Sequence, residues 1–152
     1  MLYNRDMVQE HKLPPEKIYS KAKRLWGADW YKGVVFTYGD VVYCKRRISD
    51  DVLVHETVHT KQQEKIGKDK RWDLYFEDDN FRLVNEVEAY RTQWDYIQRN
   101  EKDRNYKYIR LSEIARDLSS ELYGNLVSFG EAYDLITKKY DKETHEGETT
   151  TL

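Results

Sequence analysis

A histidine, a glutamate and a second histidine stand close together in the segment His55-Glu56-Thr57-Val58-His59. Two imidazoles that are four residues apart project from one face of a helix on successive turns, so both can bind one tetrahedral zinc ion. Glu56 directly follows the first histidine, where its carboxylate can reach a zinc-bound water rather than the metal itself. The pattern, H-E-x-x-H, therefore predicts a Zn2+ site held by His55 and His59, with Glu56 as the general base. The alternative interpretation is a surface helix that carries two histidines by chance.

A zinc ion in a catalytic site takes a third protein ligand and keeps its fourth position for water. Two glutamates, Glu86 and Glu88, are the candidates on the next long helical segment. They lie about 200° apart around a helix of 3.6 residues per turn, so only one of them can face the metal. Helix geometry by itself leaves both candidates open.

The combination resembles the gluzincin clan of zinc metallopeptidases, the thermolysin-like group, in which a glutamate on a later helix completes an H-E-x-x-H site. In that clan the glutamate often follows an asparagine or stands three residues before a small residue. Glu86 has Asn85 before it and Ala89 three residues after it. The resemblance implies that Glu86 is the third ligand. It covers roughly residues 34–99 and is specific only at these few positions.

Position 90 departs from the pattern of that clan. Many gluzincins carry an aspartate four residues after the ligand glutamate, where it accepts a hydrogen bond from the first histidine, but this chain has Tyr90. Groups of this kind fix the tautomer and the orientation of a ligating imidazole. We expect the Tyr90 hydroxyl, or a carboxylate of Asp78 or Asp79, to replace the aspartate.

The resemblance also implies a substrate and a further catalytic group. In gluzincins an edge strand beside the active helix binds an extended peptide, and the β-rich residues 34–44 occupy that place in this chain. Strand addition gives affinity with little sequence selectivity. Clan members stabilise the reaction's oxyanion with a tyrosine, histidine or arginine from their C-terminal part, and Tyr123 is the candidate donor here. We therefore expect a peptide or protein substrate along residues 34–44. The alternative interpretation is that this segment only covers the core, which it must do whether or not a substrate binds.

The other possible metal ligands are few. Peptide deformylases combine an H-E-x-x-H helix with a cysteine ligand, but their aspartate before the second histidine is absent here, where Val58 stands. Cys44 is therefore expected to be a buried residue at the end of a strand. His11 and His145 lie near the termini in polar surroundings, so we expect both to be solvated.

Charge and composition exclude several other classes of protein. Lys and Arg total 26 against 28 Asp and Glu, and the charges are interspersed, which gives a nucleic-acid partner no support. The single cysteine cannot form an intramolecular disulfide, so a reducing compartment is expected. The sequence contains no apolar run of signal-peptide or membrane-spanning character. We expect a cytoplasmic protein without a membrane partner, similar to the small stand-alone gluzincin-like proteins of bacteria and phages.

The chain of 152 residues predicts one α+β domain over residues 1–140, mostly helical, with a small antiparallel β-hairpin beside the H-E-x-x-H helix. Turn residues between two β-rich runs predict the hairpin, and an S-x-x-E capping box at Ser128 precedes the last helix. The predicted helices are 15–26, 50–66, 80–99, 106–118 and a last one from 128 to about residue 140. The other segments are predicted to be an ordered loop at 67–79, a loop at 119–127 and a disordered polar tail at 141–152.

Together these features predict a zinc metallopeptidase that cleaves peptide bonds with a water activated by Glu56. The competing hypothesis is a catalytically silent zinc-binding assembly protein, such as a virion component, that keeps the zinc-binding fold as a scaffold. A purely structural site has no need of Glu56 as a base, which favours the enzyme. Both hypotheses predict bound zinc, and only the enzyme predicts turnover.

Overall fold

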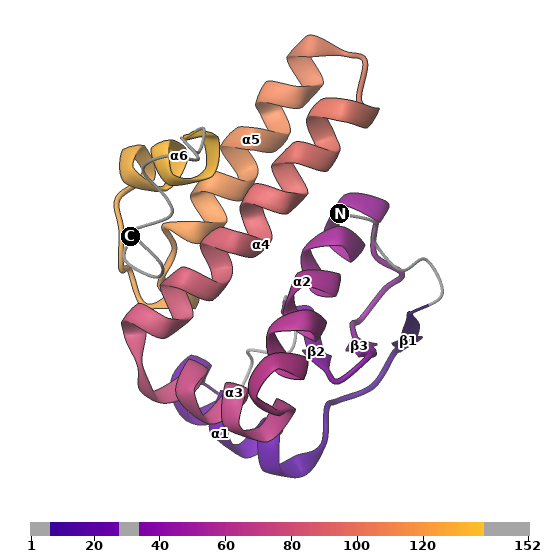
Figure 1. The fold of residues 1–152 in the computed structure, drawn as a ribbon, viewed down its shortest axis with the longest axis vertical. Helices are drawn as coiled ribbons and strands as arrows, with labels where there is room; N and C mark the ends of the chain where they lie inside the picture. The colour runs from indigo at the N-terminus through magenta and orange to yellow at the C-terminus, as the bar shows by residue number, and fades with distance from the viewer. Residues whose placement is uncertain (1–6, 28–33, 139–152) are drawn as a thin grey trace.

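The computed structural model describes residues 7–27 and 34–138. Within these ranges the chain forms six α-helices, one short 3-10 helix and a three-stranded sheet, which confirms the α+β class (Figure 1). In chain order the elements are β1 (Val8–Glu10), α1 (Glu16–Trp26), β2 (Phe36–Tyr38), β3 (Val41–Tyr43), α2 (Asp50–Ile66), α3 (Lys68–Glu77), α4 (Asp79–Asn100), α5 (Arg104–Leu118), the 3-10 helix η2 (Glu121–Tyr123) and α6 (Phe129–Thr137).

The sheet contains the predicted hairpin and one strand that the sequence did not indicate. β2 and β3 pair antiparallel, and Gly39 in the turn between them has a φ of 64°, which favours glycine. β1 pairs parallel with β3, so the strand order is β1-β3-β2 and β3 lies in the centre. A strand of three residues is too short to carry a recognisable alternation of apolar and polar side chains, which is why β1 was missed.

Helix α2 lies between the sheet and α4 (Figure 1), and its bounds agree with the prediction. Two acidic residues, Asp50 and Asp51, occupy its first turn, where negative charge is favourable, and Gly67 ends it with a φ of 94°. Every residue from 53 to 59 is buried, because α2 is covered on one side by the sheet and on the other by α4. The H-E-x-x-H segment is therefore inside the molecule rather than on its surface.

Residues 68–77 form helix α3, so the predicted ordered loop at 67–79 is wrong. The buried residues of α3 are Arg71, Trp72 and Tyr75, whose spacing is helical. One of these three buried positions is Arg71. A charged residue there interrupts the helical spacing of apolar residues, so the sequence did not indicate a helix. α3 turns the chain from α2 into α4, and its aromatic rings pack against α1 and β2.

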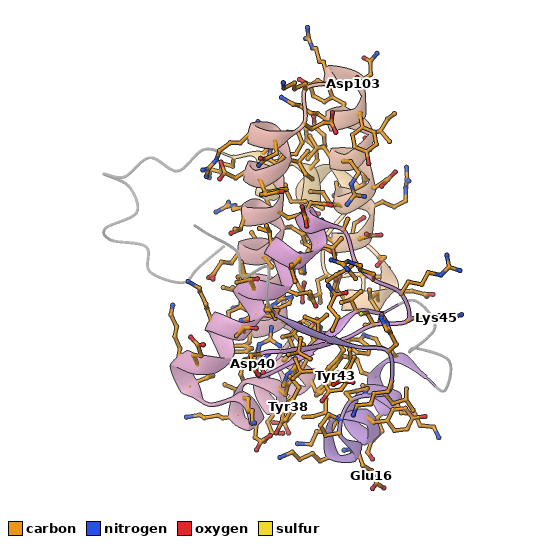
Figure 2. All side chains as sticks on the ribbon, turned by 90° about the vertical axis from the view of Figure 1, so that its right-hand side faces the viewer. Glu16, Tyr38, Asp40, Tyr43, Lys45 and Asp103 are labelled. Carbon is orange, nitrogen blue, oxygen red and sulfur yellow. The ribbon has the colours of Figure 1, made fainter. Side chains whose placement is uncertain are left out.

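Helices α4 and α5 run side by side as a long antiparallel pair, and α6 packs across them (Figure 1). Side-chain caps define their starts, since Asp78 accepts a hydrogen bond from Phe81 and Asp103 accepts from the first turn of α5. The predicted capping box at Ser128 and Glu131 is present at the start of α6. Asp103 marks one end of the long axis and Glu16 the other (Figure 2).

The main apolar core fills the space between α4, α5, η2 and α6. Its fully or almost fully buried members are Val87, Tyr90, Trp94, Ile97, Leu111, Ile114, Ala115, Leu118, Tyr123, Ala132 and Ile136. None of the helices in the described part of the chain is long and apolar enough to cross a membrane. The tail predicted at 141–152 lies outside the described residues.

Candidate metal centre

Two imidazoles from α2 and one carboxylate from α4 converge at the interface between these helices. The Nε2 atoms of His55 and His59 are 3.0 Å apart, and Glu86 lies 3.1 Å from the first through Oε1 and 3.3 Å from the second through Oε2. Ligand atoms bound to a tetrahedral zinc at about 2.0–2.2 Å lie about 3.3 Å from one another. The three groups are thus spaced as zinc ligands require, and all three residues are at most 5% exposed.

The proton on His55 is fixed by the groups behind the ring. Gln93 Nε2 donates to Asp51 Oδ2 at 2.9 Å, and a carboxylate can only accept, so the amide nitrogen of Gln93 must face Asp51. The amide oxygen of Gln93 therefore faces His55, 3.0 Å from its Nδ1. An amide oxygen accepts hydrogen bonds, so Nδ1 carries the proton. In the neutral ring Nε2 is then left with a lone pair.

His59 is oriented by Gln62 in the same way. Gln62 Nε2 donates to the backbone carbonyl of Asn85 at 2.9 Å, and Arg71 Nη2 donates to Gln62 Oε1 at 2.9 Å. The amide oxygen of Gln62 consequently faces His59, 2.8 Å from its Nδ1. Arg71 Nη2 lies 2.8 Å from the same ring nitrogen. A guanidinium can only donate, so a bond from Arg71 to Nδ1 would place the ring proton on Nε2. If Nδ1 instead donates to Gln62 and Arg71 bonds to Gln62 alone, Nε2 of His59 keeps the lone pair that a metal needs.

With both Nδ1 atoms protonated and both rings neutral, two lone pairs and a carboxylate face one another at the centre of the site. Electron-rich groups separated by 3.0–3.3 Å repel one another unless a positive charge lies among them. When protons rather than a metal supply that charge, the pKa values change accordingly. Burial by itself would raise the pKa of Glu86, but the charge of protonated His59 and hydrogen bonds donated by the protonated imidazoles hold it well below its usual range. Burial lowers the pKa of His55, but the bond to Glu86 and the charges of Glu86 and Glu56 outweigh it and raise that pKa.

Of the two glutamates left open by the spacing, Glu86 is the one that faces the histidines. Glu88 is exposed, on the opposite side of α4. Tyr75 from α3 donates from its hydroxyl to Glu86 Oε2 at 2.7 Å, and burial together with the charge of Glu86 raises the pKa of Tyr75 well above 10.0, so the hydroxyl keeps its proton. Tyr75 thus fixes the rotamer of the carboxylate that would bind the metal.

Glu56 lies beside the three ligand candidates. Its Oε2 is 3.9 Å from His55 Nε2, farther than the 3.1 Å of Glu86, and ligand atoms of His55, Glu56 and His59 all lie within 4.8 Å of one another. Thr37 of β2 donates from Oγ1 to Glu56 Oε1 at 3.2 Å and so ties the carboxylate to the sheet. Burial raises the pKa of Glu56 above its ordinary value, although the neighbouring histidines lower it. A raised pKa suits a general base that works near neutral pH.

A cavity of about 260 Å³ opens beside the site. Residues from the segment before β2 and from α2, α4, α5 and η2 form its wall: Val34, Val35, Val52, His55, Glu56, Tyr90, Gln93, Arg110, Ile114, Asp117, Leu122 and Tyr123. The wall includes the first histidine and the proposed base, so a molecule in the cavity would meet the open side of the metal site. His59 and Glu86 lie behind that wall, where they are shielded from solvent.

Tyr123 belongs to this wall and also to the main apolar core. Its hydroxyl is 2.7 Å from the hydroxyl of Tyr90, and the Tyr90 ring packs edge-on against the His55 ring with centroids 4.4 Å apart. The turn that follows η2 brings Tyr123 to this position, since Gly124 and Asn125 both have positive φ, 97° and 53°. Tyr123 therefore borders the same cavity as His55, and its role as a donor stays a prediction.

The expected partner of the first histidine was wrong. Gln93 bonds His55 Nδ1, whereas Tyr90 packs on the ring and bonds Tyr123. Asp78 caps α4 and Asp79 pairs with Arg82, so neither reaches His55. Gln93 stands seven residues after Glu86, two helical turns on, so both side chains share one face of α4. That spacing was available in the sequence, but a glutamine seven residues away is too common a feature to be recognised without the structure.

The hairpin lies beside α2 as expected, but one position on its edge strand is already occupied. The backbone carbonyl of Thr37 accepts from Gln63 Nε2 at 2.9 Å and from Trp72 Nε1 at 3.1 Å. Both of its lone pairs are used, so it has no capacity for a substrate strand. Val34 and Val35, which precede β2, are the residues of the segment 34–44 that line the cavity.

The remaining histidines and the cysteine lie elsewhere. Cys44 is buried directly after β3, as predicted, and its Sγ lies 4.0 Å from Nδ1 of His11, which is exposed. Neither is among the residues that surround His55 and His59. His145 lies outside the described residues.

No family model matches this chain, and neither does a curated protein or a solved structure. A functional assignment therefore depends on the geometry of the site.

Proposed function

We propose that this protein is a zinc-dependent peptidase that holds its metal with His55, His59 and Glu86. The observation that carries the proposal is that amide oxygens face Nδ1 of both imidazoles while both Nε2 atoms meet the Glu86 carboxylate, an arrangement that would stabilise a metal cation. Nitrogen and oxygen ligands of this kind, three in number, are typical of catalytic zinc sites. A carboxylate directly after the first histidine, on the wall of a cavity, supports hydrolysis rather than a closed structural site.

A zinc ion bound there would polarise a substrate carbonyl and lower the pKa of a coordinated water to about 7. The residues of the chain supply the rest of the chemistry. Glu56 accepts the proton of the attacking water and returns it to the leaving amine, while Thr37 holds the other carboxylate oxygen in place. Gln62 and Gln93 keep the imidazoles in the tautomer that ligation needs, because each accepts the Nδ1 proton.

Tyr90 and Tyr123 form the donor that would face the developing oxyanion. Each hydroxyl can donate one hydrogen bond, and their mutual bond uses only one of the two protons. Burial raises the pKa of both phenols well above 10.0, so both stay protonated at neutral pH. The second proton is available to a group in the cavity, and Tyr123 is the residue that we propose donates it.

The substrate in this proposal is a peptide or protein segment that enters the cavity beside the hairpin. Because the Thr37 carbonyl is occupied by α2 and α3 side chains, we place backbone pairing by an extended substrate at Val34 and Val35, which line the cavity. A short pairing segment favours small or flexible peptides over a long strand bound along the whole hairpin.

The decisive experiment compares Glu56→Gln with Glu64→Gln on the same helix. Glu64 is exposed and does not line the cavity, so its substitution removes a like charge without touching the site. Zinc content is measured by elemental analysis, and hydrolysis is measured on a mixture of fluorogenic peptides with and without a chelator. Glu56→Gln should keep its zinc and lose about 10²–10⁴-fold in turnover, because an amide cannot accept the proton of the water.

Two results would contradict the proposal in different ways. Wild-type protein that binds zinc but hydrolyses no peptide would favour the alternative, a zinc-binding assembly protein without catalytic activity. Equal turnover in Glu56→Gln and wild type would leave hydrolysis intact and remove Glu56 as the base.

A further inference from the structure

Helix α5 contributes three residues to the wall of the cavity beside the metal site: Arg110, Ile114 and Asp117. Their spacing of four and three residues places them on one face of the helix. Asp117 is in the last turn of α5 and its side chain is exposed. Within residues 7–27 and 34–138, no cation and no hydrogen-bond donor pairs with its carboxylate. Asp117 is therefore a free acid on the wall of a cavity that also contains His55 and Glu56.

Arg110, which lies on the same wall, is already paired. It donates to Asp51 Oδ2 at 2.5 Å and also pairs with Glu113, and neither of these carboxylates lines the cavity. Among the described residues of the wall, Glu56 and Asp117 carry the carboxylates, and Asp117 is the exposed one. A carboxylate at such a position attracts a cationic ligand and repels an anionic one.

Asp117 is close enough to the proposed reaction centre for its charge to act there. Asp117, His55 and Glu56 line one cavity, and the ring of Tyr90, which also lines it, packs on His55. The exposed Asp117 carboxylate has no partner among the described residues, so a cation that enters the cavity can bind to it without displacing another group.

We propose that Asp117 is a specificity-determining residue that binds a cationic group of the substrate, an ammonium or a guanidinium carried next to the scissile peptide bond. This inference rests on the proposed peptidase function and names the class of substrate for the same site. The cation has two possible sources, a Lys or Arg side chain of the peptide or its free amino terminus. Both present hydrogen-bond donors with a positive charge to the same carboxylate.

Hydroxamates test the proposal without any need for turnover, because they bind a zinc site directly. The zinc-loaded full chain is titrated calorimetrically with three ligands: Nα-acetyl-lysine hydroxamate, Nα-acetyl-norleucine hydroxamate and norleucine hydroxamate. The acetylated pair differs only in the side-chain ammonium, and the norleucine pair differs only in the terminal amine. We expect one cationic ligand to bind about tenfold more tightly than Nα-acetyl-norleucine hydroxamate, and the identity of that ligand reveals the source of the cation.

Asp117→Asn should abolish this preference and leave the affinity for Nα-acetyl-norleucine hydroxamate unchanged. Asp134→Asn is the matched control, since Asp134 is an exposed aspartate of the adjacent helix α6 that does not line the cavity, and it should keep the preference. Equal binding of all three ligands to wild type, or a preference that survives in Asp117→Asn, would overturn the role of Asp117 while the zinc site stands. Failure of every hydroxamate to bind the zinc-loaded chain would instead refute the peptidase site, and this inference with it.

Discussion

The two sides of helix α4 are built from different chemistry. Towards α5 and α6 the helix presents apolar side chains such as Val87, Trp94 and Ile97, which are part of the main core. Towards α2 it presents Glu86 and Gln93, which are as deeply buried as their apolar neighbours. Apolar burial stabilises a fold wherever it occurs, whereas a buried polar group is destabilising unless it is hydrogen-bonded. A role in function therefore explains the burial of polar residues on this side of α4 better than a role in stability does.

The polar interface meets this requirement with a nearly complete set of partners. Both glutamines have partners on both amide atoms, each imidazole has one at Nδ1, and Glu86 accepts from Tyr75. Of the side-chain atoms that the structure describes in this interface, Arg71 Nη1 alone is buried without one. The guanidinium of Arg71 is instead covered by the rings of Trp72 and Tyr75, at 4.3 and 4.6 Å from their centroids. The predictions below separate the two sides of α4, from the largest expected effect to the smallest.

The largest effect should come from the third ligand. Glu86→Gln keeps the shape and the bond from Tyr75 but replaces a carboxylate by a weak ligand, so the chain should lose its bound zinc. The stabilisation that zinc gives to the native state, about 4 kcal/mol at a free concentration a thousandfold above Kd, should be lost with it. Elemental analysis after gel filtration and the melting temperature with and without zinc measure both effects.

Glu88→Gln on the same helix is the control, because Glu88 is exposed and faces away from the histidines. It should bind zinc as wild type does. Loss of zinc in Glu88→Gln, with zinc retained in Glu86→Gln, would reverse the assignment of the third ligand.

The apolar side should respond in stability alone. Leu118→Ala removes a fully buried side chain from the main core, and the cavity that it leaves should lower the free energy of unfolding by about 2–5 kcal/mol. Zinc affinity of the folded protein should stay within a few-fold of wild type, because Leu118 belongs to the apolar core and does not line the cavity beside the site. Urea denaturation measures the free energy of unfolding, and a zinc titration measures the affinity. A large loss of zinc affinity would mean that the two sides of α4 are not independent.

Tyr123 contributes both to the apolar core and to the polar site, since it is a core residue that also lines the cavity. Tyr123→Phe removes only the hydroxyl, so zinc content should not change while turnover falls by about 10²–10³-fold, as for the loss of one transition-state donor. Steady-state kinetics on a fluorogenic peptide measure the change. Tyr106→Phe, at an exposed position on α5, is the control and should be silent. Unchanged turnover in Tyr123→Phe would make this residue a core aromatic only.

The smallest effect should come from the group behind the first histidine. Gln93→Leu keeps the volume but takes away the acceptor for His55 Nδ1 and the donor to Asp51. Substitution of such a group weakens metal binding by about 10–100-fold. Competition with a chromophoric chelator measures the affinity, and Gln98→Leu, at an exposed position of the same helix, is the control. Wild-type affinity in Gln93→Leu would show that the tautomer of His55 is set by something other than Gln93.

Much of the secondary structure could be predicted, because helices and hairpins carry local signals. The bounds of α2 and the turn at Gly39 follow from residues a few positions apart, and these elements were confirmed. Segments failed where the signal was short or interrupted. β1 has only three residues, and α3 carries Arg71 on its buried face. A charged residue at a core position breaks the apolar period, although the tertiary structure satisfies it with polar partners and aromatic rings.

The sequence by itself determined the pair His55 and His59 and the position of Glu56, because helical geometry brings residues four apart onto one face and needs no other part of the chain. Only the tertiary structure decided that Glu86, not Glu88, faces them and that Gln93 orients His55. These contacts join residues that are far apart in the chain, and their existence depends on how α2 and α4 are rotated about their axes when they pack. That rotation is set by the apolar core on the far side of α4, so the residues that build the site are positioned by residues that take no part in its chemistry.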